Sequence, residues 1–206
     1  MYYTQNNEEQ IILDYFSKHN GTLTVLDIGA NDGKTFSNSL RVIEEGWNAV
    51  LVEPSPKAFA KLKELHGNNS NVICVQSAIT NVNGTFELQE SSTLLNQGDV
   101  SLVSSIKVEE TERWRNANVL FSPVFVMGLD FKTFMVAIDQ YKFDLISIDV
   151  EGFDYDVLSQ INLTEVGCKM LIVEFNGKEK EKFVDYCSKY SMKLISENPE
   201  NLIFTL

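Results

Sequence analysis

The chain has 206 residues, of which 44% are hydrophobic and 22% are charged, as in an ordinary globular protein. No apolar run approaches the roughly 20 residues that span a membrane. Lys and Arg total 17 against 29 Asp and Glu, which gives a net charge of -12. This charge argues against a nucleic-acid partner or an anionic membrane surface, because either would repel the acidic protein. We expect one soluble, cytoplasmic domain over residues 1–206, since the start MYYTQNNEEQ lacks the features of a secretory signal.

Cysteine and histidine usage narrows the possible chemistry. Cys74, Cys168 and Cys187 are too few and too far apart for a disulfide framework or a paired-cysteine zinc site, so we expect reduced thiols. His19 and His66 are the only histidines, which excludes a histidine-rich metal cage. His66 falls in the polar segment HGNNSN and is expected at the surface.

Amphipathic stretches alternate with short apolar runs along most of the chain. An amphipathic helix is expected first, at residues 8–19, and we expect it to pack over the ligand end. The buried strands that follow are expected at residues 22–29, 48–54, 71–79, 143–152 and 169–176. Crossover helices are expected at residues 35–46, 56–67 and 154–161. This alternation predicts an α/β fold with a doubly wound, mostly parallel sheet.

Two segments depart from the alternation. Residues 193–206 contain two strand-like runs joined by a short Pro/Asn turn, which predicts a C-terminal antiparallel hairpin. Residues 81–122 are rich in Ser, Thr, Asn and Gly, so we expect an irregular insertion on the acceptor side of the site. The charged run VEETERWR within it is typical of a solvated helical face, but Trp114 would be wasted there and is a candidate for stacking on a sugar ring.

The strongest motif is VLDIGANDGKT, in which Asp27 ends a strand and Gly29 and Gly33 lie in the following loop. In a doubly wound sheet this turn lies at the ligand crevice, and its glycines let a cofactor approach the backbone. The spacing GxxxG differs from the dinucleotide form GxGxxG, and carboxylates at Asp27 and Asp32 would repel a pyrophosphate. The two carboxylates instead favour S-adenosylmethionine, which carries a positively charged ammonium and a positively charged sulfonium. The alternative is a capped helix start without a ligand.

Two further strand ends would complete an adenosine site. Glu53 in AVLVEPSP follows the second strand, where one carboxylate can accept hydrogen bonds from both ribose hydroxyls. Capping of the next helix is the alternative for Glu53. Gln76, Ser77 and Ala78 follow the third strand, where adenine would lie, although a plain turn fits these residues equally well. Together with the first loop, Glu53 predicts a cofactor that contains adenosine.

Acidic residues at the ends of the next two strands are the candidates for chemistry. IDVEGFDYDVL places Asp149 and Glu151 beside the crevice, and the Asn/Asp-Pro-Pro-aromatic segment of amine and base methyltransferases is absent, so we expect an oxygen acceptor. A sugar-type hydroxyl is a poor nucleophile, and Asp149 is our candidate general base. Glu174 and Asn176 in IVEFN are candidates for acceptor binding, with Glu174 also a second catalytic carboxylate. Alternatively, these side chains only cap turns or favour a helix N-terminus.

No bound metal is expected, because the sequence contains no compact cluster of ligands. One alternative stays open, in which Asp149, Glu151 and Glu174 converge and offer oxygen ligands to a divalent cation.

The same motifs resemble those of the FkbM family of methyltransferases. YTQNNEEQIILDYF resembles the family's opening Ser/Thr-Gln-x-x-Glu-Asp/Glu segment, and VLDIGANDG and VEPSP resemble its cofactor loop and ribose strand. SPVFVMGLDFKTF resembles the strand and Leu-Asp step that precede its fourth sheet strand. ISIDVEGFDYDVL resembles its Lys-Ile-Asp-Val-Glu-Gly signature, with Ser147 in place of the lysine. The resemblance spans about Tyr3 to Asn176.

This resemblance implies a class I, Rossmann-like methyltransferase fold, S-adenosylmethionine as the donor, and acceptor hydroxyls on sugars, glycans or natural products. It implies cofactor roles for Asp27, Gly29, Asn31 and Glu53, and an acceptor-site role for Asp149 and Glu151. Gln5 and Glu9 match the opening segment, which would border the cofactor.

We therefore predict an S-adenosylmethionine-dependent O-methyltransferase that acts on a hydroxyl of a sugar or glycan, such as a terminal sugar. One alternative is an O-methyltransferase of a non-carbohydrate natural product. Another is an oxidoreductase with an adenosine cofactor, which the loop DIGANDG disfavours, and a third is a donor-binding module without catalysis.

Overall fold

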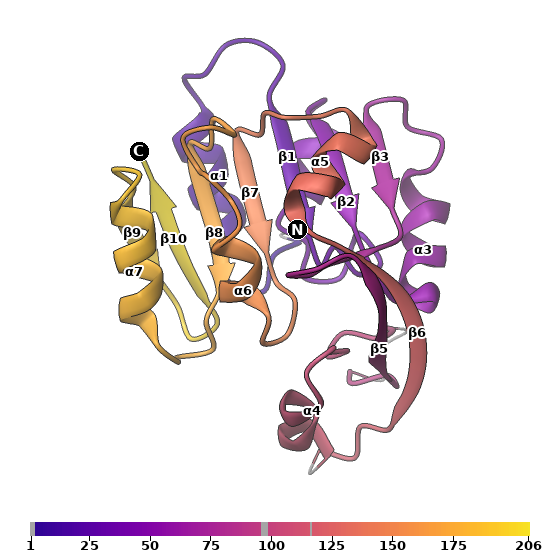
Figure 1. Cartoon of the computed structure of the whole chain (residues 1–206). Coiled ribbons are helices and arrows are strands. Elements are labelled where there is room, and N and C mark those ends of the chain that lie inside the picture. The colour runs from indigo at the N-terminus through magenta and orange to yellow at the C-terminus, as the bar shows by residue number, and fades with distance from the viewer. Residues whose placement is uncertain (1–2, 96–98, 116) are drawn as a thin grey trace.

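The computed structural model describes residues 3–95, 99–115 and 117–206, and a seven-stranded sheet forms its centre (Figure 1). The strand order is β3-β2-β1-β7-β8-β10-β9. The bounds are β1 (Thr24–Ile28), β2 (Asn48–Val52), β3 (Val72–Val75), β7 (Leu145–Ile148), β8 (Met170–Glu174), β9 (Lys193–Glu197) and β10 (Asn201–Thr205). Strands β3 to β8 in this order pair in parallel, whereas β10 is antiparallel to both neighbours. The predicted mostly parallel sheet and its C-terminal hairpin are confirmed.

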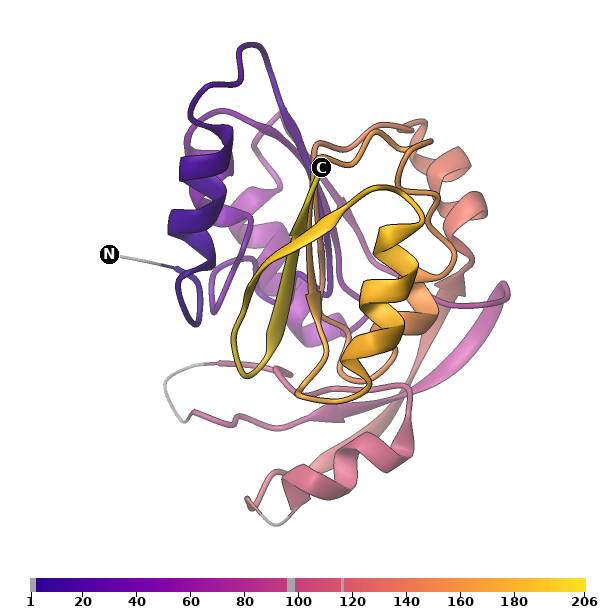
Figure 2. The same ribbon diagram turned by 90° about the vertical axis from the view of Figure 1, so that its left-hand side faces the viewer.

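Helices cover both faces of this sheet, as Figure 2 shows with the sheet seen nearly edge-on. One face carries α1 (Glu8–Phe16), α2 (Leu40–Glu44) and α3 (Pro56–His66), and the other carries α5 (Phe131–Ile138), α6 (Asp154–Leu158) and α7 (Lys180–Ser188). Alternate strand residues point to opposite faces, so Val25 joins the first core and Leu26 the second. Burial on both faces explains why the strands are continuous apolar runs.

The helix expected over residues 35–46 begins five residues later, at Leu40. Phe36 adopts a left-handed φ of 55°. The Ser37 hydroxyl then accepts hydrogen bonds from the backbone N–H groups of Ser39 and Leu40, at 3.2 and 3.0 Å. Serine side chains compete in this way with the helical backbone, so residues 35–39 form a loop that widens the turn after β1.

The expectation of an exposed His66 is wrong. His66 is the last residue of α3 and is buried, with its Nε2 3.4 Å from the carbonyl oxygen of Gly33. This contact places the end of α3 directly against the loop after β1. Burial lowers the pKa of His66, which favours the neutral imidazole.

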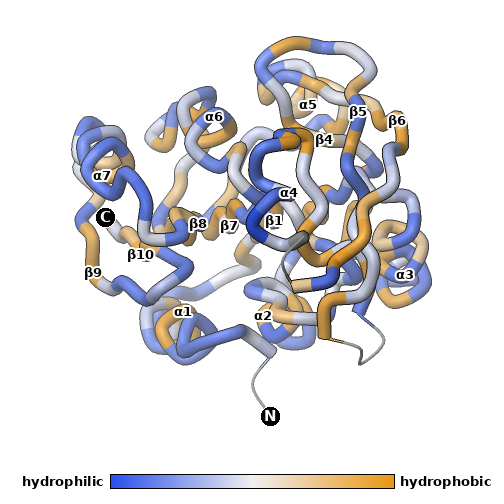
Figure 3. Tube along the Cα trace, turned by 90° about the horizontal axis from the view of Figure 1, so that it is seen from below, coloured by the Kyte–Doolittle hydropathy of each residue, from blue (hydrophilic) through white to orange (hydrophobic). Residues whose placement is uncertain are grey.

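The segment over residues 81–122 is more regular than predicted. It contains β5 (Gly84–Ser91) and α4 (Val108–Arg115), and β5 pairs along its whole length with β6 (Phe121–Leu129). With β4 (Ala78–Ile79) these strands form a second sheet, ordered β4-β6-β5. Figure 1 shows β5, β6 and α4 extending beyond the lower edge of the central sheet, and Figure 3 shows α4 over the ends of the central strands.

No helix in the described part of the chain combines the length and the apolar character needed to cross a bilayer. Cys74, Cys168 and Cys187 are free thiols. The chain order reverses beside β1, which pairs with β2 on one side and β7 on the other. In a doubly wound sheet this switch point marks the ligand crevice at the carboxyl ends of the strands.

Candidate active site

A cavity of about 350 Å³ lies at this switch point. It is bounded by the carboxyl ends of β1, β2, β7 and β8 on one side and by residues between β5 and α4 on the other. The lining includes most of the residues singled out from the sequence, namely Gln5, Asp27, Gly29, Asn31, Glu53, Ser77, Ala78, Trp114, Asp149, Glu151, Glu174 and Asn176. The fold thus brings together side chains that are up to 171 positions apart in the chain, from Gln5 to Asn176.

The loop after β1 forms one wall of the cavity. Its Gly29 has a φ of 93°, and a Cβ there would lie 1.7 Å from the backbone oxygen of Asp149, so only glycine fits. Asp27 is buried, and its Oδ2 accepts a hydrogen bond from the Ser39 hydroxyl at 2.5 Å. Burial raises the pKa of Asp27 to about 6. At neutral pH this carboxyl is therefore mostly ionised and able to attract a cationic ligand group.

Glu53 and Asn31 form the second wall. The Glu53 carboxylate accepts hydrogen bonds from the backbone N–H of Asn31 at 3.0 Å and of Ser55 at 2.7 Å, one on each oxygen. Each oxygen keeps a lone pair for a ligand hydroxyl, which fits the two hydroxyls of a ribose. The Asn31 side chain donates to the Val100 carbonyl, while its Oδ1 is buried without a hydrogen-bond partner. Both features fit an adenosine-containing ligand in this cavity.

Three of the residues considered from the sequence are directed elsewhere. Asp32 is not among the lining residues, because its carboxylate accepts hydrogen bonds from the backbone of Lys34 and from both the backbone and the hydroxyl of Thr35. Glu9 accepts one from the backbone of Tyr3, and Gln76 is exposed outside the cavity. Asp32 thus stabilises its own turn, the capping role that was the alternative for this loop.

Ser77 and Ala78 lie where the third strand leads into β4, and both line the cavity. The Ser77 hydroxyl is within hydrogen-bonding distance of the carbonyl oxygens of Ala78, at 2.9 Å, and of Met127, at 3.2 Å. It therefore ties the cavity wall to β6. Leu88 and Leu102 add apolar surface on this side, as a flat base would require.

Asp149, Asp154 and Glu174 form an acidic group at the ends of β7 and β8. One carboxylate oxygen from each lies within 4.8 Å of the others. Asp154 is fixed by the backbone N–H groups of Val150 and Gly152, each at 2.9 Å. Glu151, the third acid predicted to converge here, has a left-handed φ of 54° and pairs instead with Arg113. Asp154 thus takes the place that the sequence hypothesis gave to Glu151.

The acidic side chains raise one another's pKa values. Asp149 can be reached through the cavity, but surrounding protein atoms and the Glu151 carboxylate hold its pKa well above the usual range. Burial and Asp149 do the same for the pKa of Glu174. Burial raises the pKa of Glu151 to about 7, although the Arg113 guanidinium opposes this shift, and raises that of Asp154 to about 6.

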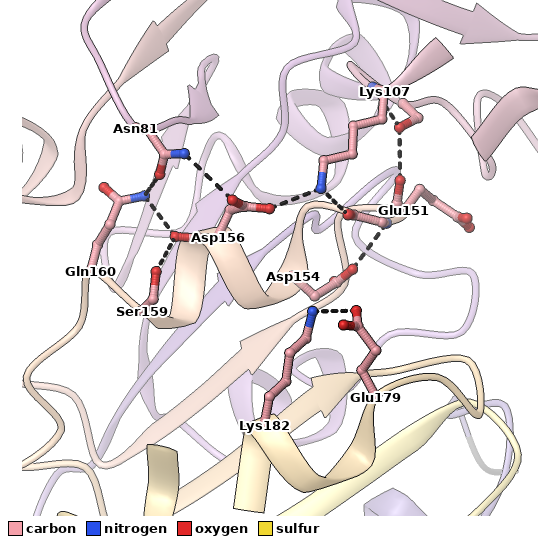
Figure 4. A network of polar contacts seen from close by, with 11 residues as sticks. Asn81, Lys107, Glu151, Asp154, Asp156, Ser159, Gln160, Glu179 and Lys182 are labelled. Carbon is pink, nitrogen blue, oxygen red and sulfur yellow. Dashed lines mark hydrogen bonds and ion pairs between the residues drawn. The ribbon is translucent and has the colours of Figure 1, made fainter. Parts of the chain in front are cut away.

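Several functional candidates were missed in the sequence. Arg113 lines the cavity and donates to Glu151 at 2.5 Å, and its guanidinium carbon lies 4.8 Å from the Trp114 ring centroid. Lys107 donates to Asp156 and to the carbonyl of Gly152, each at 2.8 Å, and so fastens the start of α4 to the loop after β7 (Figure 4). Both residues lie in or beside a run that is typical of a solvated helix, so only the fold shows that Arg113 lines the cavity and that Lys107 holds the start of α4 in place.

Asn38 and Ser147 are also among the lining residues. The Asn38 amide donates to the Ser147 hydroxyl at 3.1 Å. Ser147 stands where the resemblance to the FkbM family leads one to expect a lysine. The neutral pair leaves no cation at that position.

Comparisons with known proteins identify the family and the fold of the chain. The Methyltransferase FkbM domain matches residues 27–197. Among solved structures, monomeric WbdD superposes with a TM-score of 0.53 and 13% identity, over 98% of this chain but 41% of that one. The METTL16 MTase domain superposes with a TM-score of 0.54 and 11% identity, over 97% of this chain and 66% of that one.

Precorrin-6y C5,15-methyltransferase from Geobacter metallireducens GS-15 gives a TM-score of 0.52 and 11% identity, over 99% of this chain and 90% of that one. At such identities the likeness concerns the fold, which is that of class I S-adenosylmethionine-dependent methyltransferases. No curated protein matches the chain. The family match covers most of the sequence, and the chain therefore belongs to the FkbM methyltransferase family.

Proposed function

We propose that the protein transfers a methyl group from S-adenosylmethionine to a hydroxyl oxygen of a sugar or glycan. The family and the fold imply S-adenosylmethionine as the cofactor. The observation that supports an oxygen acceptor is the position of Asp149. Its carboxylate opens into the cavity between the cofactor wall and the wall formed by the α4 segment, whereas Glu151 is paired with Arg113 and Glu174 is buried.

The residues of the first two walls suit the donor. Glu53 offers one free lone pair on each carboxylate oxygen to the ribose hydroxyls, and Asn31 offers a buried, unpartnered Oδ1. Asp27 supplies negative charge beside the loop, where a cationic amino-acid part would be favoured. When bound, the cofactor supplies a methyl group on a positively charged sulfur.

Asp149 acts on the acceptor. The hydroxyl oxygen forms a bond to the methyl carbon while the carbon–sulfur bond breaks, and the hydroxyl proton passes to the Asp149 carboxylate. The products are a methyl ether and S-adenosylhomocysteine. Because its pKa is raised, the ionised Asp149 carboxylate is a stronger base than that of an ordinary surface aspartate.

A carbohydrate acceptor is supported by the side chains around Asp149. Trp114 lines the cavity with an aromatic ring, and Asn176 and Glu200 add polar groups to the lining. Sugars present both an apolar ring face and many hydroxyls, and this combination matches such a lining.

The experiment is a release assay for S-adenosylhomocysteine with three groups of acceptors: sugars and glycosides, non-carbohydrate alcohols, and amines or nucleobases. We expect release with members of the first group, and a methyl ether as the product identified by mass spectrometry. Turnover confined to amines or nucleobases would contradict an oxygen acceptor. Turnover confined to the second group would leave O-methylation in place and exclude the carbohydrate.

A further inference from the structure

The acidic group at the ends of β7 and β8 contains more negative charge than its neighbours compensate. Asp149, Asp154 and Glu174 come from the end of β7, the first residue of α6 and the last residue of β8. Among the described residues, none of the three carboxylates forms a salt bridge. The nearby cations have other partners, since Arg113 pairs with Glu151 and Lys107 with Asp156.

Glu174 gives an independent indication of a ligand. Its side chain lines the cavity, only 5% of the residue is exposed, and its Oε2 is buried without a hydrogen-bond partner. A buried carboxylate oxygen without a partner is costly in free energy, and such atoms are rare in folded proteins. A cation bound to that oxygen would remove the cost.

The geometry also suits a small cation. In an octahedral Mg²⁺ site each bond is about 2.1 Å long, so neighbouring oxygen ligands lie about 3.0 Å apart and opposite ones about 4.2 Å apart. The three carboxylate oxygens lie within 4.8 Å of one another, so small shifts of the side chains would bring them to one ion. Asp154 is already held in place by two backbone N–H groups, and Asp149 faces the cavity, through which an ion and its water molecules can enter.

We propose that Asp149, Asp154 and Glu174 bind one divalent cation of the Mg²⁺ or Mn²⁺ type. These cations prefer oxygen ligands and keep several positions for water or substrate. Binding requires neither the cofactor nor the acceptor. The sequence-based expectation of no metal rested on the absence of a compact cluster of ligands, and the fold creates that cluster from separate segments.

The role of the cation rests on the proposed function. Next to the acceptor pocket, it would bind the hydroxyl oxygen and lower the pKa of that hydroxyl, which makes proton loss easier. One oxygen of Asp149 would bind the cation, and the other would accept the hydroxyl proton. Asp149 thus keeps its place as the base while the cation stabilises the developing negative charge.

The test is a titration of the purified chain with Mn²⁺, followed by electron paramagnetic resonance, with Mg²⁺ as competitor and without cofactor. We expect one Mn²⁺ per chain, displaced by Mg²⁺. Glu174→Gln should weaken binding by at least about tenfold, because it removes a charged ligand. Asp149→Asn is the second variant, and it changes a side chain in open contact with the cavity, so it should leave the fold intact if Glu174→Gln does not.

Asp156→Asn is the matched control, since Asp156 lies on α6 together with the proposed ligand Asp154 but its carboxylate binds Lys107. It should keep the wild-type affinity for Mn²⁺. Absence of a bound Mn²⁺, or equal affinity in wild type, Glu174→Gln and Asp149→Asn, would overturn the proposal. Methyl transfer by a chain that binds no cation would overturn this proposal alone and leave the proposed function standing.

Discussion

A side-chain carbon at Gly29 would lie 1.7 Å from the backbone carbonyl oxygen of Asp149, so the cofactor loop and the acidic loop are in direct backbone contact. The contact fixes the distance between the donor wall and the candidate base. Such control is what methyl transfer needs, because the acceptor oxygen must align with the donor within a narrow range. Glycine is therefore needed at position 29 for the close approach of two backbone segments and not for chain flexibility.

Gly29→Ala tests this contact. Gly46 is a matched control, because it has nearly the same φ, 92° against 93°, but nothing within 4 Å of a Cβ. In both variants the free energy of unfolding should fall by roughly 1–2 kcal/mol, because alanine disfavours the left-handed backbone conformation. Gly29→Ala should lower the free energy of unfolding by roughly a further 1–3 kcal/mol, because the added Cβ would displace the Asp149 backbone. Urea unfolding measures both values, and equal losses would show that the contact is unimportant.

Asp149→Asn tests the base. The substitution keeps the shape of the side chain but removes the proton acceptor. Turnover should fall by about 10²- to 10⁴-fold, while the affinity for S-adenosylhomocysteine changes little. Single-turnover kinetics and titration calorimetry give the two quantities. Near-normal turnover would contradict Asp149 as the base and make Glu174 or Glu151 the next candidate.

Glu53 should make stability depend on pH. Burial raises its pKa to about 7 from an ordinary 4.5, so between these pH values the folded chain holds a proton that the unfolded chain has lost. Stability contributed by this proton is present at low pH and is lost as pH rises through 7. The loss is up to about 3 kcal/mol.

The measurement is urea unfolding of wild type and Glu53→Gln from pH 5 to 8. Glutamine does not titrate, so the variant should lack this part of the decline. The difference in unfolding free energy between variant and wild type should grow in favour of the variant as pH rises. Parallel curves would show that Glu53 titrates normally in the folded protein.

Trp114→Ala tests the acceptor wall. Loss of the aromatic face should raise the KM for a sugar acceptor by roughly fivefold, about 1 kcal/mol, with donor affinity unchanged. Phe125→Ala is the control, because Phe125 is 75% exposed on β6 and is not among the cavity residues. An equal effect of both substitutions on KM, or a change in donor affinity with Trp114→Ala, would contradict a role in acceptor binding.

Most of the lining of the candidate site could be predicted from the sequence, because parallel strands place their carboxyl ends together. Asp27, Glu53, Asp149 and Glu174 all follow apolar runs, and each lines the cavity. The side chains that the pattern misplaced depend on local backbone geometry. Asp32 is bound by its own turn, and no periodicity in the sequence marks such a bond.

The longer-range errors have a different cause. The pairing of β5 with β6 spans a long insertion and depends on contacts between distant residues, so the polar composition of β5 concealed it. The same insertion delivers Arg113, which pairs with Glu151, and Glu151 is not one of the three converging acids. His66 is buried because the end of α3 packs on Gly33, a contact that its polar neighbours in sequence do not indicate.

Titration calorimetry with S-adenosylhomocysteine and, separately, with NAD tests the central claim most directly. We expect S-adenosylhomocysteine to bind and NAD not to bind, because β1 places the buried Asp27 carboxyl beside the following loop, where a pyrophosphate would need hydrogen-bond donors. Glu53→Ala should weaken the binding of S-adenosylhomocysteine by about 1–3 kcal/mol, because the hydrogen bonds between the Glu53 carboxylate and the ribose are lost. Binding of NAD without binding of S-adenosylhomocysteine would contradict the assignment of this cavity as a methyl-donor site.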